Sequence, residues 1–379
     1  MKIFLYELKK ITIKQYALFI FLLVILVRLF SLPDTLKQDY GFYSDLEKDR
    51  YLEMIEAVSG KLTEENEAII IGYKEDLLAA QAEEKRLRSE YDSKKITFEE
   101  FLEQLEPYNE ILDNENIIDR IFEQYNYVVT DRENRAILPV SNVPIIESSS
   151  VDFLFLLCVV FCCAFAVMNE YTSKTNIILK TTPKGQSKTM AVKITILLSL
   201  IAITSVALSL IDLVSLSAQL APQYWGYGIR SVEQYNNSHV EISIGMMFVT
   251  VQLLKLLGFL FFGILAMITA RLTKNYVASV FPFIAFPIVV DYLAERDSQG
   301  YFLPTGLLKG YGYFFGDVAD VFSVGDPVVY FHAVPVWVLT ALIIFAVLFI
   351  ILGALALIWS DRNRLGRKGQ ISLEDKKSS

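Results

Sequence analysis

The residues of this chain with the most potential for chemistry are the charged residues that lie inside long apolar stretches. A charge in the hydrocarbon core of a membrane is expensive, so such a residue pairs with another group or lines a path for substrate. For Lys255 we expect an ion pair with Asp212, or a side chain that reaches toward the membrane surface. Structural pairing is favoured over contact with a substrate. The four residues of this kind are Arg28, Asp212, Lys255 and Asp291.

Motifs typical of enzymes are missing from the sequence. Pro183-Lys184-Gly185 does not have the glycine and lysine spacing of a phosphate-binding loop. The two histidines, His239 and His332, are isolated from each other, and Val324-Gly325-Asp326 lacks the first glycine of the intramembrane aspartyl protease motif. All three cysteines fall in one apolar stretch, where packing is the expected role. We therefore expect no catalytic residues, no metal site and no cofactor in this chain.

Six apolar stretches must position these charges. Each is near or above the roughly 18–20 residues that cross a bilayer as a helix. They cover residues 16–32, 151–168, 191–214, 244–270, 276–293 and 335–359. The first is interpreted as an uncleaved anchor, transmembrane helix 1 at 16–33. Residues 1–15 carry an apolar stripe among lysines, which predicts a helix lying in the membrane interface, with a simple positive flank as the alternative. The predicted fold class is an all-α membrane protein.

The distribution of Lys and Arg predicts the orientation of the spans. With a cytoplasmic N-terminus, the inner segments, with Lys193 included, carry 17 basic and 5 acidic residues. The outer loops 215–243 and 294–334 carry 3 basic and 7 acidic residues. Both termini, including the tail 360–379, are therefore expected in the cytoplasm of a multi-pass protein of the cell membrane. The cysteine-free exterior favours a bacterial surface.

Residues 34–150 form an acidic insert after the first span, with 28 acidic and 13 basic residues. The chain outside it carries a net charge of +7, which is too small for a large basic face and argues against a nucleic-acid partner. Apolar residues from Ile70 to Tyr91 follow a heptad repeat, and residues 98–112 offer a matching face. We expect an extracellular antiparallel coiled-coil hairpin.

Local signals in the insert and the last outer loop add detail. Gly60 is expected to end the first helix of the insert. Thr97 and Glu100 form a capping box, and Pro107 is expected to kink or restart the helix that follows. Residues 127–140 predict a small strand pair. The apolar, glycine-rich outer segment 294–334 predicts short re-entrant or interfacial helices.

The inner loop 169–190 carries the most specific pattern. An acidic residue ends the second span, a Thr-Ser turn and a short apolar segment follow, and a Thr-Pro pair precedes a basic residue in the third span. The segment resembles the permease subunits of type-2 ATP-binding-cassette (ABC) exporters, in which this loop is the coupling helix that contacts a separate ATPase. Lys174 stands where that family has glycine. The matching residues are Glu170, Thr172, Ser173, Leu179, Thr182, Pro183 and Lys193.

The resemblance covers most of 1–32 and 151–359 but leaves out the insert. It implies a cytoplasmic ABC ATPase subunit as partner, ATP and Mg on that partner, and a second permease copy in a homodimer or heterodimer within membrane lipid. The implied function is export of a substrate such as a cationic or antimicrobial peptide or a lipid-like compound. The alternatives are an ordinary positively charged loop at 169–190 and a membrane receptor or scaffold that uses the insert for sensing or binding without transport.

Overall fold

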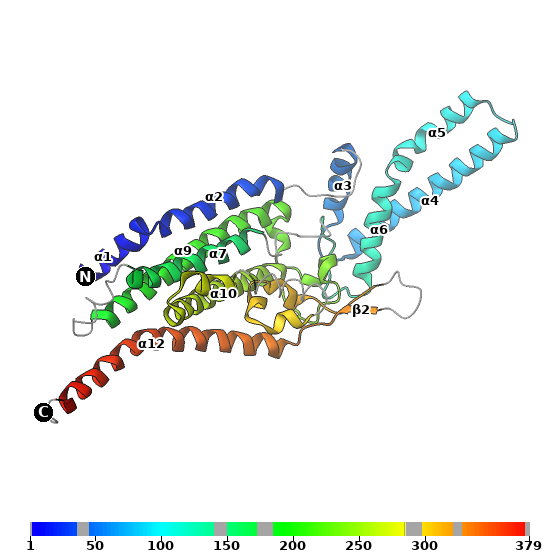
Figure 1. The fold of residues 1–379 in the computed structure, drawn as a ribbon. Coiled ribbons are helices and arrows are strands. Elements are labelled where there is room, and N and C mark those ends of the chain that lie inside the picture. The colour runs from blue at the N-terminus through cyan, green and yellow to red at the C-terminus, as the bar shows by residue number, and fades with distance from the viewer. Residues whose placement is uncertain are drawn as a thin grey trace. The chain divides into compact units, whose positions relative to one another are not determined.

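Almost all of the chain that the structure describes is helical (Figure 1). The computed structural model describes residues 2–35, 45–139, 150–172, 185–283, 285, 298–320 and 328–375. The chain divides into two compact units. The bundle unit comprises Met1–Leu36, Pro144–Ala218 and Met246–Ser379, and the insert unit comprises Lys37–Val143 and Gln219–Gly245. Residues 219–245, most of which the sequence predicts as the outer loop 215–243, therefore belong with the insert.

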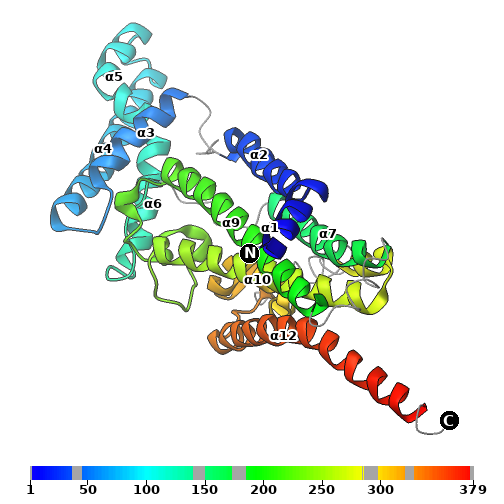
Figure 2. The same ribbon diagram turned by 90° about the vertical axis from the view of Figure 1, so that its left-hand side faces the viewer.

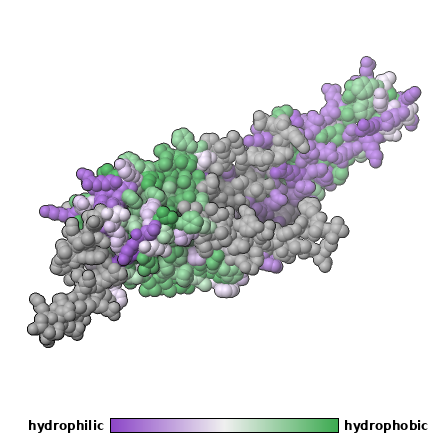
Figure 3. Space-filling view, in the orientation of Figure 1, coloured by the Kyte–Doolittle hydropathy of each residue, from purple (hydrophilic) through white to green (hydrophobic). Residues whose placement is uncertain are grey.

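Long apolar helices build the bundle unit. They are α2 (Ala17–Thr35), α7 (Ser150–Thr172), α9 (Gly185–Gln219), α10 (Ile244–Thr273) and α12 (Val336–Asp375). Among the described residues, α7, α9, α10 and α12 each contain a stretch long and apolar enough to cross a membrane. Figure 1 shows these helices running alongside one another, and Figure 3 shows hydrophobic residues over their visible surface. Four of the six predicted spans are thus present as membrane-length helices.

The first predicted span is bent. Helix α1 (Lys2–Lys9) continues as a π-helical turn over Lys10–Lys14, and this pair meets α2 at 51°. Tyr16 lies at the break with a φ of 59°, a left-handed conformation that ends a regular helix. With this bent pair counted as one span, the described residues contain up to five spans. Half of the predicted span 276–293 lies outside the described residues; the part seen, 276–283 and 285, is helical.

Aromatic rings and small residues pack the core of the bundle unit. Phe155 of α7 makes edge-on contacts with the rings of Phe21, at 5.8 Å, and Phe259, at 4.4 Å. Gly263 of α10 faces Ile201 and Cys163 so closely that a Cβ there would lie 3.0 Å and 3.4 Å from them. The cysteines of α7 are free thiols within this packing.

The segment before α12 contains short elements. Three 3₁₀ turns cover Ser298–Phe302, Pro304–Leu307 and Gly310–Phe314. Strands β1 (Val318–Asp320) and β2 (Val328–Phe331) then pair antiparallel. The sequence predicted short helices here, but it did not predict the strand pair.

Four helices form most of the insert unit: α3 (Asp45–Val58), α4 (Glu64–Asp92), α5 (Phe98–Asp113) and α6 (Glu115–Val129). Helices α4 and α5 lie side by side as an antiparallel hairpin (Figures 1 and 2). As predicted, Gly60 follows α3 with a φ of +115°. The capping box is also confirmed: the Glu100 amide donates to the Thr97 hydroxyl, and Thr97 N–H donates to the Glu100 carboxylate at 2.7 Å.

The side chains at the heptad positions of α4 are buried to different extents along the helix. Four of them are buried, namely Ile70, Leu77, Ala80 and Leu87, while Tyr91 at the tip is exposed. Near its base, α4 joins α3, α6 and the segment after α6 in one apolar cluster. That cluster consists of Tyr51, Ile55, Val58, Ile70, Ile117, Ile121, Val128 and Ile137. The insert unit therefore has a hydrophobic core of its own.

One local prediction for the insert was wrong, and one of the two alternatives for Pro107 is excluded. The strand pair at 127–140 is not formed: Tyr127 to Val129 complete α6, whose helical apolar face extends to the buried Val128. Ile137 instead pairs with Gly60 through reciprocal backbone hydrogen bonds of 2.8 and 2.9 Å. Helix α5 does not restart at Pro107 but runs through it to Asp113, and the chain breaks at Asn114 before α6.

Candidate functional site

A buried ion pair joins the two helices that flank the proposed coupling loop. The Lys193 ammonium of α9 binds the Glu170 carboxylate at the end of α7 and donates to the Ala166 carbonyl at 3.0 Å. The Lys193 side chain is 1% exposed and that of Glu170 is 12% exposed. The carboxylate of Glu7 on α1 is also buried and interacts with Lys193 electrostatically. Charged residues from three helices therefore meet at this end of the bundle unit.

The loop itself is seen only at its borders. Helix α7 ends at Thr172, whose hydroxyl donates to the Asn169 carbonyl at 3.3 Å, and α9 begins at Gly185. The intervening site residues predicted from the sequence, Ser173, Leu179, Thr182 and Pro183, lie outside the described residues. The structure thus brings Glu170 and Lys193 together and leaves the remainder of the predicted coupling site as a prediction.

A second polar cluster lies toward the C-terminal end of α9 and joins it to α2 and α10. Arg28 of α2 donates to one oxygen of Asp212 of α9 at 2.8 Å and 2.5 Å. Gln252 of α10 donates to the other oxygen at 3.3 Å and accepts from the Ser209 hydroxyl at 2.9 Å. A carboxylate with partners on two other helices is well suited to fix how those helices pack.

Lys255 has a different partner from the one expected. Its ammonium contacts the Asp152 carboxylate in the first turn of α7 at 2.8 Å, and its side chain is 2% exposed. Asp212 is occupied by Arg28, so the predicted Lys255–Asp212 pair is wrong. The partner depends on which faces of α7, α9 and α10 meet, and the sequence does not specify these rotations. Asp291 lies outside the described residues.

Each buried cation of the bundle unit described here has a carboxylate partner. Removing one member of a buried pair leaves an uncompensated charge, and this typically destabilises a protein by about 3–5 kcal/mol. Sequence reasoning missed three participants: Glu7, Asp152 and Gln252. A polar residue in or next to an apolar stretch was the available signal for each of them. These clusters can hold helices in register, so the role that they support is a mechanical one.

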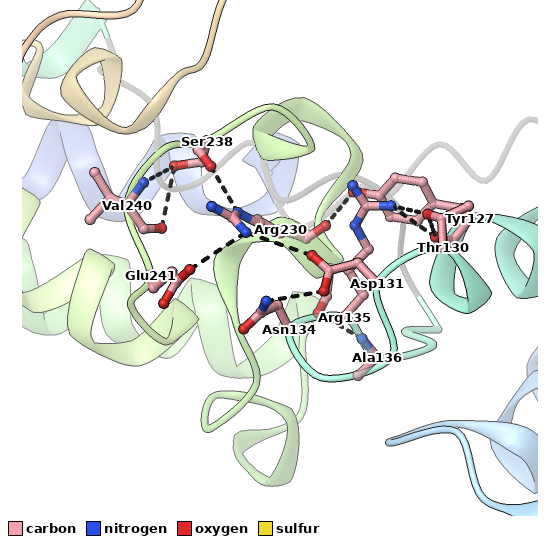
Figure 4. A network of polar contacts seen from close by, with 11 residues as sticks. Tyr127, Thr130, Asp131, Asn134, Arg135, Ala136, Arg230, Ser238, Val240 and Glu241 are labelled. Atoms are coloured by element: carbon pink, nitrogen blue, oxygen red, sulfur yellow. Dashed lines mark hydrogen bonds and ion pairs between the residues drawn. The ribbon is translucent and has the colours of Figure 1, made fainter.

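Arg230 is the centre of a polar clasp in the insert unit (Figure 4). Its guanidinium lies 3.6 Å from the Asp131 carboxylate and 3.8 Å from that of Glu241, and it donates to the Ser238 carbonyl at 2.8 Å. The Tyr127 hydroxyl donates to the Arg230 carbonyl. The loop after α6 and the 219–245 segment are thus connected through one arginine.

Arg135 reinforces the same junction (Figure 4). Its guanidinium lies 3.9 Å from the centre of the Tyr127 ring and donates to the Thr130 hydroxyl at 2.6 Å. The Ala136 amide donates to the buried Ser231 hydroxyl at 2.9 Å. An open cleft of about 230 Å³ lies beside the clasp, lined by residues of both segments. This junction explains why 219–245 folds with the insert.

Glu67 links α4 to the end of α6 and should make the insert unit sensitive to acid. The Tyr125 hydroxyl and the Arg132 guanidinium both donate to its carboxylate, at 2.8 and 2.7 Å. These contacts, that of Tyr125 first, lower the pKa of Glu67 below its usual 4.5. A lowered pKa contributes stability above 4.5 that disappears as the pH falls through the folded-state value.

We expect Glu67→Gln to lower the thermal unfolding midpoint of the insert unit at neutral pH, because the ionic contacts are lost. The difference from wild type should shrink as the pH falls below 4.5, where the wild-type carboxylate also becomes neutral. Near-ultraviolet circular dichroism of the full chain in detergent measures both midpoints. A difference that stays constant into strong acid would show that Glu67 acts through packing alone.

No group of three or more His, Cys, Asp or Glu side chains within the described residues is arranged to hold a metal ion. In comparison with known proteins, no family model, no curated protein and no solved structure matches the chain.

Proposed function

We propose that this chain is the membrane-spanning subunit of an ATP-driven exporter that works with a separate cytoplasmic ABC ATPase. The observation that carries the proposal is the buried Glu170–Lys193 pair. A loop that only connects two spans needs no ion pair at its base. The pair makes the end of α7 and the start of α9 move together, which suits a loop that receives force.

The arrangement of the helices supports the remainder of the proposal. The chain spans the membrane six times, with both termini in the cytoplasm. Figure 1 shows α1 and the C-terminal half of α12 at the same end of the bundle unit, as an even number of spans requires. Two such subunits, identical or related, enclose the path, and ATP and Mg bind the partner ATPase. Closure of that ATPase on ATP pushes residues 170–183 and opens the pair of subunits outward.

The insert unit is the part that meets the substrate. On this proposal it lies outside the cell, where α4 and α5 form an antiparallel coiled-coil hairpin; the buried positions at Leu77 and Leu87 support that packing. The separate core and the open cleft of the insert unit also suit a second candidate function, a receptor or scaffold that binds without transport. The two functions differ in whether an ATPase acts through residues 170–193.

Single-cysteine labelling tests the orientation on which the proposal depends. In a background without Cys158, Cys162 and Cys163, we expect a membrane-impermeant maleimide to label Ala82→Cys and Gln223→Cys in intact cells. Lys188→Cys should be labelled only after the cells are opened. All three positions are exposed, so accessibility differs only by side of the membrane. Labelling of position 188 in intact cells would place the loop outside and exclude a cytoplasmic ATPase as its partner.

A further inference from the structure

Helix α5 stands out within the insert unit because its apolar side is incompletely covered. None of its residues, all of which the structure describes, is buried. In contrast, the other helix of the hairpin, α4, buries Leu77 and Leu87. The most open apolar side chains of α5 are Phe98, 56% exposed, and Leu102, 48% exposed. The contact with α4 therefore leaves part of the α5 apolar face unpartnered.

Aromatic rings extend this open face to the tip of the hairpin. Tyr91 of α4 lies 6.0 Å from the ring of Phe98 and 5.8 Å from that of Phe101. Phe98 and Phe101 are stacked at 6.4 Å. Leu102 follows Phe98 by one helical turn, so both occupy the same side of α5. Figure 3 shows a hydrophobic patch near the end of the hairpin, surrounded by hydrophilic residues.

Carboxylates border the open edge of this face. At roughly 100° per residue, five acidic side chains fall within about 80° of arc, next to the side on which Leu102 lies. They are Glu99, Glu103, Glu106, Glu110 and Asp113. Helix α5 contains no basic residue. One apolar strip and one anionic strip thus run parallel along the helix.

These carboxylates have no partner among the described residues, whereas three carboxylates of α4 are paired with arginines. On α4, Glu83 and Glu90 bind Arg86, and Glu67 binds Arg132. No ion pair or side-chain hydrogen bond to a described residue is formed by Glu99, Glu103, Glu106, Glu110 or Asp113. Their charge is available to a molecule that approaches the open edge.

We propose that this face of α5 binds a cationic amphipathic helix, whose apolar side covers Phe98 and Leu102 and whose basic side meets the carboxylate strip. A second copy of α5 would bring unpaired carboxylates against each other, and an anionic lipid surface would be repelled. A basic amphipathic helix satisfies both strips at once, in the manner of a helix laid on an apolar groove. Binding follows from α5 alone; its meaning as substrate capture rests on the proposed export function.

Binding to the full chain tests this inference. The chain is placed in lipid discs of zwitterionic phosphatidylcholine, and empty discs give the background. The probe is a synthetic helix of Lys, Leu and Ala in amphipathic order; one control peptide carries Glu for every Lys, and another has the same composition in scrambled order. We expect saturable binding of the probe only, with a Kd that rises with salt because exposed charges are screened within about 10 Å at 0.1 M ionic strength.

Matched variants then locate the site. Glu99→Gln/Glu103→Gln/Glu106→Gln should raise the Kd about ten-fold, since each exposed ion pair contributes roughly 0.2–1 kcal/mol. Leu102→Ser should weaken binding as well. Three exposed acids of α4 serve as the control, Glu64→Gln/Glu65→Gln/Glu75→Gln, which changes the net charge equally and should leave the Kd unchanged. Equal effects of the two triple variants, binding of the scrambled peptide, or self-association through α5 would each overturn the inference.

The outcome is separate from that of the export proposal, because no ATPase is present in the binding experiment. A chain that binds the probe through α5 but never associates with an ATPase would keep the inference and reject export. A chain that exports, but whose α5 variant binds the probe as wild type does, would keep the export proposal and reject the inference.

Discussion

Asp212→Leu is expected to destabilise the bundle unit by about 3–5 kcal/mol, because it leaves the Arg28 guanidinium buried without its carboxylate. Arg28 is 5% exposed and donates two hydrogen bonds to one oxygen of Asp212. Gln252 loses an acceptor in the same variant.

The double variant Arg28→Leu/Asp212→Leu provides the control. It removes both charges together, and replacing a buried ion pair with apolar groups is often neutral. Heating the detergent-solubilised chain and following its monodisperse fraction by size-exclusion chromatography measures the order of stability. We expect wild type and the double variant to be close and the single variant to be far below them. A single variant as stable as wild type would mean that the Arg28–Asp212 contact contributes nothing to the fold.

Local features of the insert could be predicted from the sequence because they depend on neighbouring residues. The Thr97 and Glu100 side chains cap α5 through contacts three residues apart. Gly60 ends α3 because it adopts a φ of +115°, a conformation that other residues rarely take. The periodic spacing in α4 likewise identified the side that buries Leu77. None of these depends on how distant segments meet.

Contacts between distant segments were not predictable in the same way. Lys255 pairs with Asp152, which precedes it by 103 residues, and not with Asp212. Asp152 lies in the first turn of α7 and Asp212 near the C-terminal end of α9, so the choice depends on how these helices are rotated toward α10. Arg230 holds the 219–245 segment in the insert unit through Asp131. Nothing in the sequence distinguishes Arg230 from other charged loop residues. Its partner, Asp131, becomes evident only from the folded end of α6.

The error at residues 127–140 has a physical cause. Tyr127, Val128 and Val129 favour strands by intrinsic preference, but such preferences are weak against tertiary packing. The apolar residues Ile117, Ile121 and Val128 recur at helical spacing and all reach the insert core. Burial of that face extends α6 to Val129, and the chain then turns at 130–134.

Glu170→Gln is expected to lower export per ATP hydrolysed about ten-fold or more while the protein still inserts. The amide can still accept a hydrogen bond from Lys193, which also keeps its contact with the Ala166 carbonyl. The electrostatic link between the end of α7 and the start of α9 is lost, however. A weakening of about 1.4 kcal/mol in the coupled state corresponds to the ten-fold change. Glu170→Asp, which keeps the charge on a shorter side chain, should retain part of the coupling.

The most direct measurement is ATP hydrolysis and export by the assembly purified from its native membranes through a tag on this chain. In lipid vesicles, we expect the wild-type assembly to hydrolyse ATP and to move the cationic helical probe. The Glu170→Gln assembly should hydrolyse ATP at a similar rate with a much lower yield of transport. An assembly that hydrolyses no ATP above background would contradict the account, and so would an unchanged ratio of transport to hydrolysis in the variant.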